Sequence, residues 1–175
     1  MFCLDIGCGL KKKDKYIGID PIKTEVVDIV ARVENLPFKN STIDKIYSRH
    51  TLEHVDDFEK AIGEMWRVSK PNATIEIIVP FWAHSVANHP THRRFFNYYS
   101  FDEYSLQNSK RWIPDKDIKF KIEKREYKFQ KRRFPFSVFY TIIEKLANKY
   151  YNSYESTFAN IFPAYEIYFK LRVIK

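Results

Sequence analysis

Several features that mark secreted and membrane proteins are missing from this chain. Its two cysteines, Cys3 and Cys8, are too few for a disulfide framework, which favours a reducing compartment. No run of eighteen apolar residues occurs, so we expect no membrane span. The start is not expected to be a signal peptide, because Asp5 and two glycines interrupt its apolar run. These absences predict a cytoplasmic protein.

Two common phosphate-binding motifs are also missing. Gly7 and Gly9 begin a G-x-G pattern, but Leu10, Lys11 and Lys12 follow, and the third glycine of a dinucleotide fingerprint is absent. No Gly-Lys-Ser/Thr phosphate loop occurs either. The glycine pattern alone therefore does not identify a nucleotide site.

What the chain does contain is a pair of matching strand ends near its start. One apolar run ends in Asp5-x-Gly7-x-Gly9, and a second apolar run ends at Asp20. Glycines let the backbone approach a ligand closely, and an acid at the next strand tip can accept hydrogen bonds from ribose hydroxyls. The pair predicts a nucleoside-containing cofactor at the carboxyl ends of a parallel sheet.

Further landmarks follow along the first half of the chain. They are Leu36-Pro37-Phe38, Leu52-Glu53-His54, Arg67-Val68-Ser69-Lys70-Pro71 and Val79-Pro80. With the opening turn, this succession resembles the class I S-adenosylmethionine-dependent methyltransferases, in particular the methyltransferase type 11 group. The resemblance implies an α/β fold with a Rossmann-like, mostly parallel seven-stranded sheet. It also implies an enzyme that uses S-adenosylmethionine as its methyl donor.

The resemblance further implies which residues hold the cofactor. Gly7, Cys8 and Gly9 would form the turn beneath its methionine and ribose parts. Asp5 would orient that turn and reach the ammonium group, and Asp20 would hold the ribose hydroxyls.

The adenine contact departs from the family pattern. Relatives often carry an acid four residues before Leu36-Pro37-Phe38, whereas Arg32 stands there in this chain. The contact would then come from Asp28, from backbone, or not at all. The backbone N–H of Val33 remains a candidate donor to the adenine ring.

Two histidines follow the fourth expected strand. His50 lies where the family places residues that flank the transferred methyl, so it is a candidate for both catalysis and cofactor binding. An imidazole poised near neutrality could serve as general base, or His50 could only pack on the cofactor; both interpretations remain open. For His54 a structural hydrogen bond is the favoured role.

A further group of histidines lies in the irregular segment after the fifth expected strand. The spacing of His84, His89 and His92 does not match a standard zinc pattern, so we expect no metal. Together with Trp82 and Arg93, these histidines are instead expected to line the substrate mouth.

The chain is expected to form a single domain over residues 1–175. Its parts would be a cofactor-binding half (1–82), an irregular lid or substrate loop (83–113), and C-terminal strands with a helix (114–175). Strands are expected near residues 2–6, 16–20, 25–30, 43–47, 74–80, 118–131 and 165–174.

Helices are predicted from capping and apolar spacing. Asp56, with Glu59 three residues on, is expected to cap a helix that ends at Ser69-Lys70-Pro71. A second helix would begin near Pro135. Its apolar face would contain Phe139, Ile142, Ile143 and Leu146.

The connections at the start of the sheet are too short for helices. About nine residues join the first two strands, and fewer join the second to the third, whereas a parallel crossover usually needs a dozen or more. One flank of the sheet thus lacks its covering helices. We expect the aromatic C-terminal half or a second copy of the chain to hide its apolar face, and we hypothesise a homodimer.

Charge favours an anionic partner. The formal net charge is +8, and the excess of Lys and Arg lies after residue 82. The expected acceptor is oxygen or nitrogen of a small molecule or glycan, while RNA or protein methylation and a non-catalytic binding subunit remain alternatives. The RNA alternative depends on basic residues interleaved with phenylalanines, namely Lys128, Lys131, Arg132, Arg133, Phe129, Phe134 and Phe136.

Overall fold

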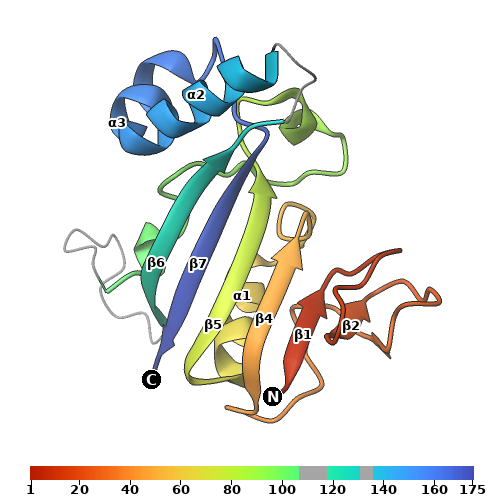
Figure 1. The fold of residues 1–175 in the computed structure, drawn as a ribbon. Coiled ribbons are helices and arrows are strands. Elements are labelled where there is room, and N and C mark those ends of the chain that lie inside the picture. Colours follow the sequence, from red (N-terminus) through yellow and green to blue (C-terminus); the bar gives the residue numbers. More distant parts are fainter. Residues whose placement is uncertain (107–117, 131–135) are drawn as a thin grey trace.

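The computed structural model describes residues 1–106, 118–130 and 136–175, which contain one seven-stranded sheet (Figure 1). The strand order is β3-β2-β1-β4-β5-β7-β6, and all neighbours are parallel except that β7 is antiparallel to β5 and β6. The predicted Rossmann-like α/β sheet is therefore confirmed. The strands are β1 (Cys3–Ile6), β2 (Ile17–Asp20), β3 (Ile29–Val30), β4 (Ile43–Arg49), β5 (Ser69–Pro80), β6 (Lys119–Lys128) and β7 (Glu166–Ile174).

Two strands differ in length from the expectation. β3 contains only two residues, because the preceding chain forms a turn in which Val27 N–H donates to the Thr24 carbonyl. β5 begins at Ser69 instead of near residue 74, because the chain passes from the helix directly into the strand. Asn72 takes a left-handed conformation in this added part of β5.

Helix α1 (Phe58–Val68) joins β4 to β5 and buries Ala61, Ile62, Met65 and Val68. Its N-cap is Asp57, whose carboxylate accepts a hydrogen bond from Lys60 N–H at 3.0 Å, so the expected cap at Asp56 was wrong by one residue. The Asp56 carboxylate instead pairs with Arg32 and Arg93.

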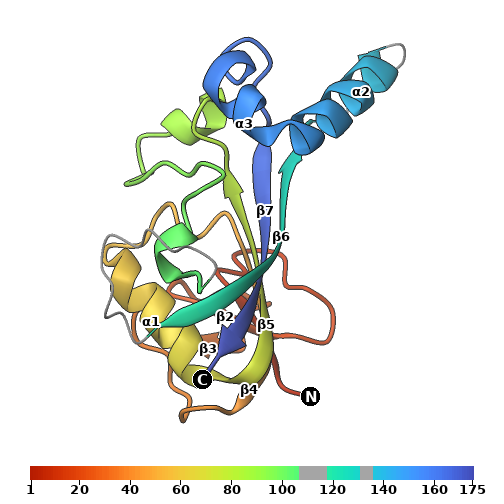
Figure 2. The ribbon, with the colours of Figure 1, turned by 90° about the vertical axis from the view of Figure 1, so that its left-hand side faces the viewer.

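One face of the sheet is apolar and covered. Helix α1 and the chain that follows β5 lie on the same side of the sheet (Figure 2). Phe101 from that chain packs on Phe169 of β7, with ring centroids 4.7 Å apart, and Phe58 of α1 contacts Phe96. Within the described part of the expected lid, Phe96, Phe101 and Tyr104 are thus part of the core. Only its first half, residues 83–94, remains near the strand tips.

As expected from the short connections, the described residues contain no helix between β1 and β2 or between β2 and β3. The face that such helices would cover is not apolar, however. Lys45 and Glu76 form an ion pair across β4 and β5 at 2.8 Å, and Glu123 pairs with Lys170 at 3.0 Å. Polar residues alternate with apolar ones along these strands, so the polar side chains lie on this face of the sheet and are in contact with solvent. The expectation that an apolar flank must be hidden was wrong.

The remaining helices are α2 (Phe136–Lys149) and α3 (Tyr151–Ser153), followed by a π-helical turn (Tyr154–Phe158). Helix α2 extends away from the sheet (Figure 2). Three residues of its predicted apolar face are about half exposed: Phe139, Ile142 and Leu146. Within the described residues, no helix has the length and hydrophobicity needed to cross a membrane.

Candidate functional site

The turn after β1 requires glycine at two positions for different reasons. Gly7 has φ +72°, and a Cβ built on it would lie 2.0 Å from Thr51 Oγ1. Gly9 has φ +53°, but a Cβ there would meet no atom within 4 Å. Gly7 is therefore needed both for its conformation and for the close approach of Thr51, while Gly9 is needed for conformation alone.

Two buried or half-buried acids organise this turn. The Asp20 carboxylate accepts from Gly9 N–H at 3.0 Å and from Ile22 N–H at 2.9 Å, so it ties the turn to the tip of β2. Asp5 accepts from Lys13 N–H at 2.6 Å, and burial raises the pKa of its carboxyl. Both acids thus lie where the sequence predicted, at the ends of two adjacent parallel strands.

The Cys8 side chain is part of the packing beneath the turn. Its sulfur lies 2.9 Å from the place where a Cβ on Gly18 would stand, so the missing side chain of Gly18 makes room for it. Burial, reinforced by the charges of Asp5 and Asp20, raises the pKa of the Cys8 thiol to about 11. Cys8 is therefore neutral at physiological pH and is not an activated nucleophile.

A cavity of about 160 Å³ opens beside the glycine turn. Of the expected cofactor residues, Gly7 and Val33 line it, whereas Asp5, Cys8, Gly9, Asp20, Asp28 and His50 do not. Thr51, which lies against Gly7, also lines it. Its other lining residues are Ile6, Pro21, Ala31, Arg32, Glu34, His54 and Val55. The cavity lies at the tips of β1, β2, β3 and β4, the place predicted for the cofactor.

Asp28 does not line this cavity. Its carboxylate accepts from Gly18 N–H at 2.7 Å and pairs with Lys12 at 2.6 Å. The proposed adenine contact by Asp28 is thus not supported by its position. Arg32 does line the cavity, and its guanidinium pairs with Glu34 and Asp56.

His50 follows β4 in a strained left-handed conformation, with φ +52°. Its Nδ1 lies 3.4 Å from Glu53, and its Nε2 lies 3.4 Å from Glu166. Burial alone would lower the pKa of His50, but the two carboxylates outweigh it and raise the pKa to about 9. His50 is therefore protonated near neutral pH, which disfavours the general-base interpretation.

The predicted substrate-binding residues separate into different places. His92 lies against His54, with ring centroids 4.6 Å apart, whereas His84 packs on Tyr165 at 5.1 Å. The exposed Arg93 side chain pairs with Asp56 at 3.0 Å, and His89 Nδ1 lies 2.9 Å from Thr91 Oγ1. His89 and His92 lie together, with ring centroids 5.5 Å apart, whereas His84 lies elsewhere.

Trp82 lines a second, larger cavity of about 670 Å³ between the chain after β5 and the turn after α3. Its indole N–H donates to Glu155 at 2.9 Å, and Glu155 also accepts from the Tyr127 hydroxyl. The other lining residues are Ala83, Asn88, Phe95, Phe96, Asn97, Ser100 and Asn160. The cavity is large enough for a small-molecule acceptor.

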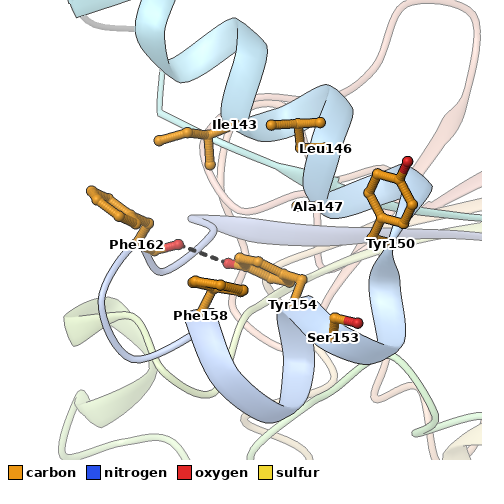
Figure 3. A pocket seen from close by; sticks show the side chains of 8 residues that line it. All are labelled: Ile143, Leu146, Ala147, Tyr150, Ser153, Tyr154, Phe158 and Phe162. Atoms are coloured by element: carbon orange, nitrogen blue, oxygen red, sulfur yellow. Dashed lines mark hydrogen bonds between the residues drawn. The ribbon is translucent and has the colours of Figure 1, made fainter.

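A third hollow of about 330 Å³ lies between α2 and the turn that follows α3. Figure 3 shows Ile143 and Leu146 on one side of it and Tyr154, Phe158 and Phe162 on the other, with the Tyr154 hydroxyl donating to the Phe162 carbonyl. Its lining is almost entirely apolar and shares no residue with the other two cavities.

Several residues at the strand tips were not identified as site residues from the sequence. Glu53 stands within the Leu52-Glu53-His54 landmark, which was the available signal. Thr51 is adjacent to it. Glu166 begins the last strand, and no local pattern connects it with His50, 116 positions earlier; only the pairing of β7 with β5 does so.

Residues 4–77 match the methyltransferase domain family. A curated relative, ajmaline N-methyltransferase of Rauvolfia serpentina, is 32% identical over 100 residues, which cover 43% of this chain and 34% of the relative. The chain thus spans about a third of the length of the curated relatives it matches.

Solved structures share the fold over nearly the whole chain. The YcgJ protein from Bacillus subtilis has a TM-score of 0.61 at 15% identity, covering 99% of this chain and 92% of its own. A SAM-dependent methyltransferase from Archaeoglobus fulgidus has a TM-score of 0.60 at 15% identity, covering 97% and 85%. The resemblance noted in the sequence is confirmed, and S-adenosylmethionine is the methyl donor that the matched domain implies.

Proposed function

We propose that this chain is an enzyme that transfers a methyl group from S-adenosylmethionine to oxygen or nitrogen of a small, anionic or sugar-like acceptor. The observation that carries the proposal is the cavity beside Gly7, at the tips of four parallel strands, within the part that matches the methyltransferase domain. Ligands of this sheet architecture bind at such a position.

The residues beside the cavity fit the proposed cofactor. Gly7 presents backbone without a side chain, Asp20 offers carboxylate oxygens for ribose hydroxyls, and Val33 offers a backbone N–H toward the adenine ring. The sulfonium of the bound cofactor supplies an already activated methyl group. The chain itself then needs chiefly to orient the acceptor and exclude water.

The acceptor class is supported by size and charge. The cavity at Trp82 holds about 670 Å³, which suits a small molecule. The excess of positive charge after residue 82 favours an anionic group on that molecule through the overall field of the chain, because the lining of this cavity contains no basic side chain. By its name, the curated relative methylates a nitrogen of ajmaline, which is compatible with a nitrogen acceptor here.

The RNA alternative loses part of its support among the described residues. Phe129 is only 7% exposed and cannot stack on a base, and the Lys128 ammonium pairs with Glu126 at 2.6 Å. Lys131, Arg132, Arg133 and Phe134 lie outside the described residues. A non-catalytic binding subunit that keeps the fold remains the alternative of a different class.

Calorimetry with S-adenosylmethionine and S-adenosylhomocysteine tests the proposal. We expect binding by the wild type and a loss of at least about tenfold in Asp20→Ala, because the ribose contact is removed. Asp28→Ala is the matched control: it removes a carboxylate that accepts from Gly18 N–H and pairs with Lys12 and has no proposed ribose contact, so affinity should change little. No heat for either nucleoside at millimolar concentration would overturn the proposal and favour the binding subunit.

A further inference from the structure

Three potential metal ligands meet beside the cavity at Gly7. Glu53 and His54 come from the chain after β4, and His92 comes from the chain after β5. One ligand atom from each residue lies within 4.8 Å of the others. The sequence did not group these residues, because 37 positions separate His54 from its contacts at Thr91.

The Glu53 carboxylate is the unusual member of the group. Its residue is 1% exposed, and neither carboxylate oxygen has a hydrogen-bond partner among the described residues. Its charged neighbour is His50, whose Nδ1 lies 3.4 Å away. His50 supplies a charged neighbour on one side but no hydrogen bond, so both oxygens of this buried carboxylate remain available to a metal.

Both histidines have a backbone carbonyl beside Nδ1, which leaves Nε2 as the candidate ligand atom. His54 Nδ1 lies 3.2 Å from the Thr91 carbonyl oxygen, and His92 Nδ1 lies 3.1 Å from the Ala87 carbonyl oxygen. An imidazole that donates Nδ1–H to a carbonyl presents an unprotonated Nε2. This arrangement is the usual outer contact of a metal-bound histidine.

We propose that Glu53, His54 and His92 bind one divalent first-row transition-metal cation. Two imidazole nitrogens and one carboxylate oxygen suit zinc or iron(II), and three protein ligands leave coordination positions open. His54 also lines the cavity beside Gly7, so an oxygen of a second ligand could reach those positions from the candidate active site. This site replaces the expectation that the chain binds no metal; it does not include His84 or His89.

Titration of the metal-free, full-length protein with Zn²⁺, and with Co²⁺ as a spectroscopic probe, tests the site. We expect one cation per chain and a Co²⁺ absorption spectrum of nitrogen and oxygen ligation. Glu53→Gln, His54→Ala and His92→Ala should each weaken Zn²⁺ binding at least tenfold. Glu53→Gln is nearly isosteric, so it separates lost ligation from lost folding, which circular dichroism monitors in each variant.

His84→Ala is the matched control, because His84 is a histidine of the same segment that packs on Tyr165 and lies outside the cluster. Its affinity for Zn²⁺ should remain within twofold of the wild type. A loss equal to that of His92→Ala would mean adventitious binding by loop histidines and would overturn the assignment, as would wild-type binding in Glu53→Gln. Calorimetry with S-adenosylhomocysteine on the same samples reports the proposed function separately.

Discussion

At the scale of single residues, the two glycines of the first turn should respond differently to the same substitution. In Gly7→Ala, the new Cβ must displace Thr51 and the residue must keep a positive φ, which alone costs about 1–2 kcal/mol for an L-residue. In Gly9→Ala the new Cβ meets no atom, so stability is lowered only by the positive φ that the alanine must adopt. For a chain of this length, about 1 kcal/mol lowers Tm by about 2–4 °C.

Thermal unfolding and cofactor calorimetry on the two glycine variants check this. We expect the larger loss of Tm and of S-adenosylmethionine affinity in Gly7→Ala. Equal losses in the two variants would show that Thr51 moves aside at no cost, and that glycine is needed at both positions only for its backbone conformation.

The Cys8 thiol gives a second test at this scale. Because its pKa is raised to about 11, only a small fraction is thiolate at pH 8, and its reaction with iodoacetamide should be slow. As long as the pH is below that pKa, the reaction rate should increase about tenfold for each unit by which the pH is raised. A Cys3→Ser variant isolates Cys8, and mass spectrometry of native and urea-unfolded samples measures the difference. Labelling of the native chain at the unfolded rate at pH 8 would contradict the buried position.

At the scale of elements, the cap of α1 distinguishes adjacent aspartates. Asp57→Ala removes the hydrogen bond to Lys60 N–H and should cost about 1 kcal/mol of unfolding free energy. Asp56→Ala removes only exposed pairs with Arg32 and Arg93, which contribute little. Urea unfolding of both variants measures the difference in unfolding free energy. A larger decrease in Asp56→Ala than in Asp57→Ala would show that Asp56 is the cap, as the sequence pattern predicted.

That displaced cap illustrates what the sequence could and could not predict about elements. The apolar runs and the spacing of Ile62, Met65 and Val68 place strands and helix correctly, because period and burial are local properties. The cap depends on the backbone direction at the end of the loop, where the Asp56 carboxylate pairs with Arg32 and Arg93 instead of with the helix. Those contacts join distant parts of the chain and leave no local pattern.

The residues of the candidate site also fall into those that local sequence predicts and those that depend on contacts between distant segments. Gly7 and Asp20 follow from the ends of two consecutive apolar runs, so the turn and its acid were predictable. The group formed by Glu53, His54 and His92 exists only because the chain after β5 returns to the tip of β4, where Arg93 N–H donates to the Glu53 carbonyl at 2.8 Å. No spacing within either segment indicates that contact.

At the scale of the whole molecule, the exposed apolar surface lies in a different place from the one that the short connections suggested. They suggested the sheet face without helices, whereas the structure has it on α2. The flank without helices is stable in water because its strands present charged residues such as Lys45 and Glu76. The apolar surface that lacks a cover lies instead on α2. If the chain forms the homodimer that we hypothesised, α2 is therefore the surface through which it should pair.

A symmetric dimer pairs the same patch on both copies, and an apolar helix face is self-complementary in this sense. The formal net charge of +8 opposes association, so dimerisation through α2 should strengthen with salt as the repulsion is screened. Sedimentation velocity at low and high salt measures this. Ile142→Glu should yield monomers, whereas Thr141→Glu, an exposed position beside the patch, should not. A monomeric wild type at high salt and about 100 μM, where even micromolar dimers would form, would remove the homodimer and leave α2 for a different partner.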